Sequence, residues 1–389
     1  MSGYISSNAN RFYTALETNY GQAVPVSASN RFPATKIIAH QIVESGKRLD
    51  KTGSRTYLGA PETGLRKTAF EARSYLTGWN GVGQPCYGPL FEAGLGSIPN
   101  ASSGLVVSSV LSTTQIRTAV PHGLSAGSGV SISNEIRFVT SAPDAFTLVL
   151  NAPFSSTPAP NSAAAPCISY SVATHLPSVT LYDYWDPSTA MSRMITGAAV
   201  DVLGISIKGD RHEFRFSGPA ADLISANSFA AGEGGLSSYP SEPTLVPFDC
   251  YGVPGHLGQV WLGSSLNRFF TLTKASIEVK NNIGLRDNEF GSSFPLGMAA
   301  GLRKVISSFA LLAQDDAQSV ALYAAAKQRT LISAMLQLGQ QQGQLMGIYL
   351  PEVKPEIPQY NDSETQLQWE FNNNVAQGTL NDEIYIAFA

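Results

Sequence analysis

Polar and apolar residues alternate one by one in two short segments of the chain, EFRF (213–216) and QLQWEF (366–371). Such period-two alternation predicts a β-strand with one buried and one solvated face. Further strand-like runs are FEARSYL, ISSFALL, SVTLYDYW and QLMGIYLPEVKPEIP. The pattern therefore predicts a mainly β protein with many short strands joined by turns.

Two segments predict short helices between these strands: YGPLFEAGLG and DDAQSVALYAAAKQR. In the second, Asp315 or Asp316 is placed to cap the first turn, and Lys327 and Arg329 lie near the C-terminal end. A helical register puts Ala317, Val320, Ala321 and Ala324 on one face.

The tetrapeptide GLRK occurs at 64–67 and again at 301–304. Upstream of it, at a constant offset of 238 residues, seven positions match: Lys36, Gly46, Arg48, Gly53, Ser54, Leu58 and Gly59 with Lys274, Gly284, Arg286, Gly291, Ser292, Leu296 and Gly297. Glycines that recur in step indicate that the same backbone turns are needed twice. The sequence therefore predicts a tandem duplication of one β-rich domain.

The offset between the copies falls from 237 at GLRK to 153 at SVTLYDYW and LISAMLQLG, so the first copy holds about 84 additional residues. They lie at roughly 97–174, which read as short strands with glycine turns and end in TPAPNSAAAP. We expect a small inserted β-domain there, on the outer surface and dispensable for assembly. The full division predicted is an N-terminal arm (1–35), a discontinuous first domain (36–96 and 175–225), the insertion (97–174), a flexible linker (226–255) and a second domain (256–389).

Each copy carries a polar, glycine-spaced loop of about 20 residues before GLRK, at 44–63 and at 281–300. Long loops in compact domains are usually functional or disordered, and matched glycines in both copies favour a defined shape that contacts something; the alternative is a solvated hairpin tip. The candidate contact residues are Gly46, Arg48, Gly53, Gly59, Gly284, Arg286, Gly291 and Gly297.

Composition narrows the function classes. The formal net charge is −4, whereas a tight nucleic-acid binder needs a basic face. The three cysteines and five histidines are scattered, and we expect no metal, no cofactor and no disulfide framework. The N-terminal segment is unlike a signal peptide, and no apolar run approaches a membrane span.

Catalytic motifs such as GxSxG, HExxH and the phosphate-binding GxxxxGK[ST] do not occur. Asp183, Asp186 and Glu213, with Tyr184 and Trp185 nearby, could imitate the paired carboxylates of a glycosidase. The second copy has no acids at the matching stretch, so we expect no enzyme. A glycan-binding or glycan-cleaving β-protein is the alternative, and a capsid or decoration protein is a third possibility.

The chain resembles the tail tube proteins of long-tailed, non-contractile bacteriophages. The residues that carry the resemblance are NRFYTALETNYGQAVPV near the start, and the helix, the LGQQQGQLMGIYLPEVKPEIP hairpin, the LQWEF strand and NDEIYIAFA at the end. The tandem copy is similar to double-length members of that family. The resemblance implies β-sandwich or half-barrel domains with one helix each, whose sheets join those of neighbouring domains into an inner barrel.

The resemblance also implies partners and a location. Rings of the protein would stack into a tube around a tape measure protein, between a tail terminator and distal tail or baseplate proteins, within a virion assembled in the host cytoplasm. DNA would pass through transiently, along a lumen with few cations. Six domains close such a ring, and since this chain supplies two, we expect a homotrimer with pseudo-sixfold symmetry; the alternative is a hexamer.

Overall fold

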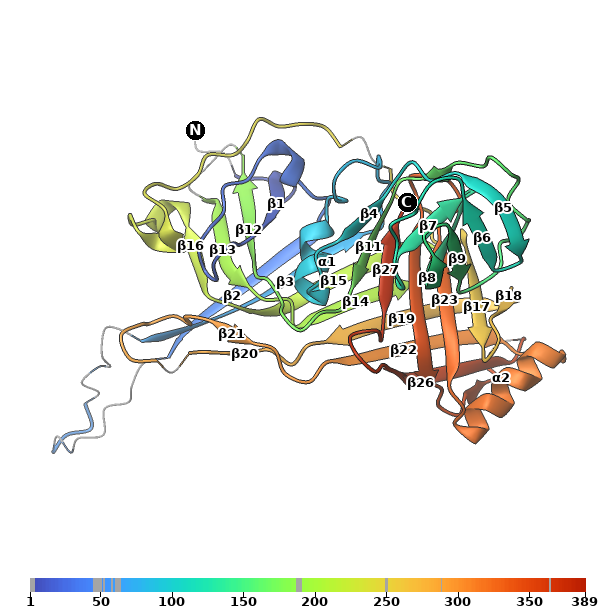
Figure 1. The fold of residues 1–389 in the computed structure, drawn as a ribbon. Helices are drawn as coiled ribbons and strands as arrows, with labels where there is room; N and C mark the ends of the chain where they lie inside the picture. The colour runs from blue at the N-terminus through green and yellow to red at the C-terminus, as the bar shows by residue number, and fades with distance from the viewer. Residues whose placement is uncertain are drawn as a thin grey trace.

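The computed structural model describes residues 4–44, 51, 53–56, 59, 64–186, 191–248, 251–287, 289–363 and 365–389. The protein is mainly β, as the alternating pattern predicts. Among the described residues there are two α-helices, α1 (Gly88–Leu95) and α2 (Ala317–Gln328). Figure 1 shows a broad layer of long strands, with the smaller sheets and α1 above it and α2 at its far border.

The first copy consists of two four-stranded antiparallel arrangements. The upper one has the order β1-β12-β13-β16; its strands are Asn10–Leu16, Val179–Trp185, Arg193–Ala198 and Asp222–Ser225. The lower one has the order β2-β3-β15-β14; its strands are Lys36–Glu44, Leu65–Tyr75, His212–Ala220 and Val202–Ile207. Their apolar faces meet in one core, into which α1 also packs.

The second copy repeats this arrangement strand by strand. Its upper part has the order β17-β23-β24-β27, with strands Gly258–Gly263, Ile332–Leu338, Met346–Lys354 and Tyr385–Phe388. Its lower part has the order β19-β22-β26-β25, with strands Leu272–Lys280, Lys304–Leu312, Gln368–Gln377 and Gln359–Asn361. β18 (Asn267–Phe269) adds a border strand beside β17.

The pairing register is also repeated. Lys36 lies opposite Arg73 in the first copy, and Lys274 lies opposite Ala310 in the second, which are the same positions at offsets of 238 and 237. β1 occupies the place that β17 has in the second copy. The expectation of an N-terminal arm over 1–35 is therefore wrong for β1, which is an integral strand paired with β12 along its whole length.

The glycine that begins GLRK is required for the same structural reason in both copies. A Cβ on Gly64 would lie 2.6 Å from the carbonyl oxygen of Glu44, and a Cβ on Gly301 would lie 2.6 Å from that of Asn282. Glu44 and Asn282 are themselves matched positions at the offset of 238. Real Cβ atoms do not approach a backbone oxygen this closely, so only glycine fits where the chain returns alongside the end of the outgoing strand.

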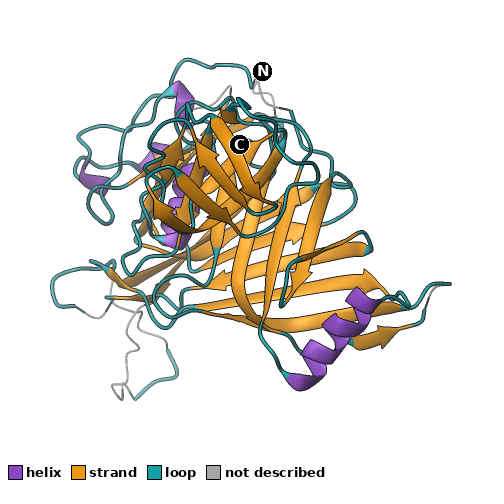
Figure 2. Ribbon diagram, turned by 45° about the vertical axis from the view of Figure 1, so that its right-hand side comes forward, coloured by secondary structure: helices purple, strands orange, loops and turns teal. Residues whose placement is uncertain are grey.

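The two copies are joined by backbone pairing within the chain. β14, the border strand of the first copy, pairs antiparallel with β19 of the second over six residue pairs, from Val202↔Lys280 to Ile207↔Ala275. The lower layers thereby become one continuous sheet, whose central path runs β26-β22-β19-β14-β15-β3-β2. Figure 2 shows these long strands side by side.

Helix α2 begins where the sequence predicts. The carboxylate of Asp316 accepts hydrogen bonds from the backbone N–H groups of Gln318 and Ser319, each at 2.8 Å, and so caps the first turn. The buried side chains of this helix are Ser319, Leu322 and Ala326. The apolar face predicted around Val320 is therefore not the packed one, because the helix lies at the border of the sheet and Val320 is exposed.

The insertion folds as a six-stranded sheet of order β10-β7-β8-β9-β6-β5 with its own apolar core. Its strands are β5 (Val107–Ser112), β6 (Gln115–Thr118), β7 (Gly129–Ile132), β8 (Glu135–Asp144), β9 (Thr147–Leu150) and β10 (Ala164–Ala165). The strands that lead in and out, β4 (Asn100–Ser102) and β11 (Cys167–Ser171), pair with each other, and β11 also pairs with β27.

The insertion interrupts the first copy in sequence but packs on the second copy. Ile136 and Phe138 belong to the same apolar cluster as Trp261, Met335 and Tyr349 of the upper sheet of the second copy. The ring of Phe138 stacks on that of Tyr349 with centroids 5.7 Å apart. The sequence predicts that the insertion lies on the outer surface and is dispensable for assembly; the structure adds that it packs on the second copy through an apolar base.

The segment expected as a flexible linker is packed over much of its length. Phe229, Leu236 and Tyr239 lie against Tyr13, Tyr184 and other buried residues of the upper sheet of the first copy. The carboxylate of Glu242 accepts hydrogen bonds from the Arg11 guanidinium and from the Tyr13 hydroxyl. Residues 226–248 thus cover the outer face of that sheet, although their glycine and proline content is typical of a linker.

Candidate functional site

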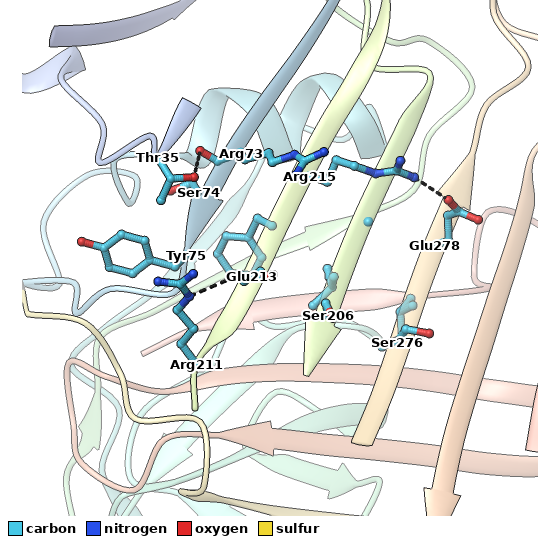
Figure 3. Close-up of a pocket in the computed structure, with 14 residues that line it drawn as sticks. Thr35, Arg73, Ser74, Tyr75, Ser206, Arg211, Glu213, Arg215, Ser276 and Glu278 are labelled. Carbon is cyan, nitrogen blue, oxygen red and sulfur yellow. Dashed lines mark hydrogen bonds and ion pairs between the residues drawn. The ribbon is translucent and has the colours of Figure 1, made fainter. Parts of the chain in front are cut away.

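The lower sheet has one face in the core and one open face. A hollow of about 520 Å³ lies on the open face where the two copies meet. Figure 3 shows its polar side chains, which come from β3, β15, β14 and β19; those labelled are Thr35, Arg73, Ser74, Tyr75, Ser206, Arg211, Glu213, Arg215, Ser276 and Glu278.

Six cationic side chains on the open face each lie 2.5 to 3.4 Å from a carboxylate, which is two residues away, across a turn or across an intervening strand. The pairs are Arg73–Glu71, Lys208–Glu213, Arg211–Glu213, Arg215–Glu278, Lys280–Glu278 and Lys274–Glu370. Strand pairing brings together two of these pairs, Arg215–Glu278 and Lys274–Glu370, whose members are distant in sequence. The other four pairs join residues that are two to five positions apart.

One of these ion pairs crosses the junction between the copies. Arg215 lies opposite Gly204, and Gly204 lies opposite Glu278, so the pair spans three strands. Because Gly204 has no side chain, the Arg215 guanidinium reaches over β14 and donates to the Glu278 carboxylate at 2.9 Å. The pair is exposed, so it adds little stability, but it can form only in the register in which the two copies join.

The predicted loop of the second copy projects from one end of the sheet, whereas most of the matching loop 44–63 lies outside the described residues. In the second copy, β20 (Gly284–Leu285) and β21 (Met298–Ala299) extend the β19–β22 hairpin. Figure 1 shows this extension beside the neighbouring ends of β2 and β3. The backbone N–H of Arg66 donates to the carbonyl of Ser293 at 2.7 Å, which ties the two hairpins to each other.

The eight candidate loop residues have different surroundings. Gly53, Gly59 and Gly291 have positive φ angles of 70°, 91° and 94°, and a Cβ on any of them would meet nothing within 4 Å. Gly284 lies in β20, and Arg286 forms an ion pair with Glu289 while its backbone N–H donates to the carbonyl of Gly297 at 2.9 Å. Gly46 and Arg48 lie outside the described residues.

The sequence reasoning missed the apolar side chains at this tip. Phe290 is fully exposed, and Phe294 and Leu296 are also exposed. Their signal is visible in the segment EFGSSFPL, in which large apolar residues stand between polar and glycine residues of a loop. Exposed apolar groups on a projecting hairpin indicate a contact surface.

A cavity of about 310 Å³ lies at the opposite end of the same strands. β19 runs from Leu272, which lines this cavity, to Lys280, which leads into the projecting hairpin. Phe269, Phe270 and Leu336 also line it, and Phe270 is 81% exposed. Each chain therefore has a projection with apolar side chains at one end and a hollow of mixed apolar and polar lining at the other.

The three carboxylates considered for glycoside cleavage are used separately. Asp183 on β12 is buried, accepts a hydrogen bond from Arg193 at 2.9 Å, and pairs with Asn10 at 3.1 Å. Glu213 is on β15 of the other layer, paired with Arg211 and Lys208. Asp186 is exposed, 3.9 Å from Arg11. The structure does not assemble them into one site.

His212 at the start of β15 gives the protein a pH-dependent stability. Its side chain is buried, and burial lowers its pKa to about 4, against a smaller opposing effect of Asp210. The unfolded chain binds a proton near pH 6.5 and the folded chain does not until about pH 4. Stability from this residue is complete above pH 6.5 and is lost as the pH falls towards 4.

We therefore expect the parent protein to lose about 3 kcal/mol of stability through this residue between pH 6.5 and pH 4, and His212→Gln to abolish that loss. Urea unfolding at pH 7.5, 6, 5 and 4 measures this, with the exposed His40→Gln variant as the control. Parallel pH profiles for His212→Gln and the parent protein would contradict the assignment.

In comparisons with known proteins, no family model and no curated protein matches the chain. Within the described part of the chain, no helix is long and apolar enough to cross a membrane. The same residues contain no group of three or more histidine, cysteine, aspartate or glutamate side chains placed to hold a metal ion.

Proposed function

We propose that this protein is a structural subunit of a bacteriophage tail tube, in which rings of the chain stack into a conduit for DNA. The observation that carries the proposal is the β14–β19 junction, through which two copies of one domain share a continuous sheet. A domain that joins its own copy edge to edge can join further copies in the same way. Six such domains close a barrel and leave no lateral sheet edge open.

Three chains supply the six domains, so the ring is a homotrimer with pseudo-sixfold symmetry. Half of the lateral junctions are then within a chain, where they form at high effective concentration. Only the first copy contains the insertion, so the ring carries three protrusions.

The two ends of the sheet support stacking of rings. A projecting hairpin at one end and a hollow partly lined by Phe269, Phe270 and Leu336 at the other make a head-to-tail contact possible. Head-to-tail contacts that do not close on themselves produce open filaments. The exposed Phe290 and Phe294 of one ring would meet the next ring.

The open face of the sheet lines the conduit in this proposal. Each phosphate that a cation neutralises adds salt-sensitive affinity for DNA. The six paired cations on this face already have carboxylate partners, so phosphates must compete for them and the duplex is not held. The protein would thus act mechanically, without turnover, and within a virion it would contact a tape measure protein in the lumen and terminator and distal tail proteins at the two ends.

Electron microscopy of the purified protein at high concentration tests this function. We expect stacked rings with three protrusions each and a ring mass of three chains of 41.3 kDa. Six protrusions per ring, or a mass near six chains, would rule out the trimer. A monodisperse monomer that cleaves a polysaccharide would rule out the conduit and favour the glycan-binding or glycan-cleaving alternative.

Gly53→Val and Gly291→Val are expected to shorten or abolish tubes while leaving folded rings. Both glycines have positive φ, which a β-branched residue resists, but neither has a neighbour that a side chain would strike. The strain therefore reshapes the loop and does not disrupt a core. Tube length in negative-stain images is the measurement, and Gly123→Val, at an equally open position of the insertion with a φ of 63°, is the control. Tubes of parental length in both loop variants would remove this role from the loops.

A further inference from the structure

The lower sheet has two free borders that are copies of strands already joined inside the chain. One border is β2, which is the counterpart of β19, and the other is β25, which is the counterpart of β14. β14 and β19 pair with each other. The β14–β19 junction inside the chain is therefore a template for a second junction, which β25 of one chain and β2 of another would form.

The register of that junction can be carried over row by row. One row of directly opposed residues crosses the first copy, and the matching row crosses the second: Lys36, Arg73, Arg215 and Gly204; Lys274, Ala310, Glu370 and Gln359. Gly204 continues across the junction to Glu278. In the second copy Gln359 takes the place of Gly204, and in the first copy His40 takes the place of Glu278, at the offset of 238. Gln359 is therefore placed to meet His40 of another chain.

The neighbouring rows follow from the same offsets. Ile205↔Ile277 becomes Tyr360↔Ala39, and Ser206↔Ser276 becomes Asn361↔Ile38. The faces agree, because Ile205 and Ile277 point into the core, and Tyr360 lies on the core side against Tyr323 of α2. A large tyrosine opposite a small alanine occupies the space that two isoleucines fill inside the chain.

Exposure at the free borders differs from exposure at the closed junction. Ile277 and Ile205 are each 2% exposed, whereas Tyr360 is 62% exposed and Ala39 is only half-buried. Ile38 is also exposed on the open face. Apolar side chains that are buried at the closed junction are thus uncovered at both of its free counterparts.

Charge also fits the carried-over row. Inside the chain, a base and an acid flank the residue of β14, as Arg215 and Glu278 on either side of Gly204. Across the free borders, an acid and an imidazole flank the residue of β25, as Glu370 and His40 on either side of Gln359. No like charges therefore face each other across either residue.

We propose that β25 of one chain pairs antiparallel with β2 of a second copy of this chain, in the register Gln359↔His40, Tyr360↔Ala39 and Asn361↔Ile38. The inference rests on the proposed ring of three chains and names the strands and residues that close it. The pairing is short, because Pro358 next to β25 has no N–H to donate. That shortness makes assembly depend on all three junctions closing together.

Cysteine cross-linking tests the register. Ile38→Cys with Asn361→Cys is introduced into a chain in which Cys86 and Cys250 are serine. The matched intrachain pair, Ser206→Cys with Ser276→Cys, sets the oxidation conditions, since its residues are directly opposed in the structure. Ile42→Cys with Asn361→Cys is the off-register control, four residues or about 13 Å further along β2.

We expect the Ile38–Asn361 pair to give disulfide-linked trimers on non-reducing gels, with at least tenfold less product from the Ile42–Asn361 pair. Stronger cross-linking of the Ile42 pair would overturn the register. Three-protrusion rings in micrographs without an Ile38–Asn361 cross-link would overturn this inference and leave the proposed function standing. Cross-linked trimers that never stack would support the junction and contradict the tube.

Discussion

Arg137→Ala is expected to lower the free energy of unfolding by about 3–5 kcal/mol, as removal of one partner from a buried ion pair does. Arg137 is fully buried between the insertion and the second copy. Its guanidinium pairs with Glu135, donates to Gln337 at 3.2 Å and lies 4.1 Å above the ring of Trp261. Burial lowers the pKa of Arg137 to about 10, so the group stays charged at neutral pH.

The loss arises mainly from the Glu135 carboxylate, which the variant leaves buried without its cation. Arg137→Met combined with Glu135→Gln should therefore recover part of the stability. Arg215→Ala is the matched control, because the exposed Arg215–Glu278 pair should change stability by less than about 1 kcal/mol. Urea unfolding followed by tryptophan fluorescence measures all three. Equal midpoints for Arg137→Ala and Arg215→Ala would show that the insertion is not held through Arg137.

Deletion of residues 103–166 is expected to produce a chain that binds a hydrophobic dye and unfolds at a lower urea concentration. Ser102 and Cys167 lie directly opposite each other in the β4–β11 pair, so an Asn-Gly turn can join them without strain. The deletion uncovers the surface that Ile136 and Phe138 occupy on Trp261, Met335 and Tyr349. Whether the shortened chain still forms tubes of normal bore, as expected from the sequence, is a separate measurement by electron microscopy.

Phe138→Ala weakens the packing of the insertion on the second copy without removing the inserted domain, so its effect can be compared with that of the deletion. Phe138 is fully buried, and large-to-small substitutions of this kind cost about 3–5 kcal/mol. Leu111→Ala, at an exposed position of the same domain, should change stability by no more than about 0.5 kcal/mol. A shortened chain with the parental midpoint and no dye binding would mean that the insertion is only an appendage.

The structure also separates what could be predicted about the candidate site from what could not. The glycine-spaced loops were found because a positive φ, as at Gly53 and Gly291, leaves a mark in the sequence. The ion pairs on the open face cannot be recognised in the sequence in this way. Arg215 and Glu278 are 63 residues apart, and only strand pairing makes them neighbours.

The sequence by itself determined the local features of this protein: the strands at EFRF and QLQWEF, the Asp316 cap of α2 and the duplicated hairpin with its glycines. These follow from period-two burial, from helix capping and from close backbone approaches that only glycine allows. Such features act over a few residues or repeat at a fixed offset. Only the tertiary structure decided on which copy the insertion packs, that β14 joins β19, and that residues 226–248 cover a sheet. The physical reason is that alternation shows that a face is buried but not what buries it. The same apolar side chains can be satisfied by a helix, another sheet or a second copy, and the choice depends on contacts between residues far apart in the chain.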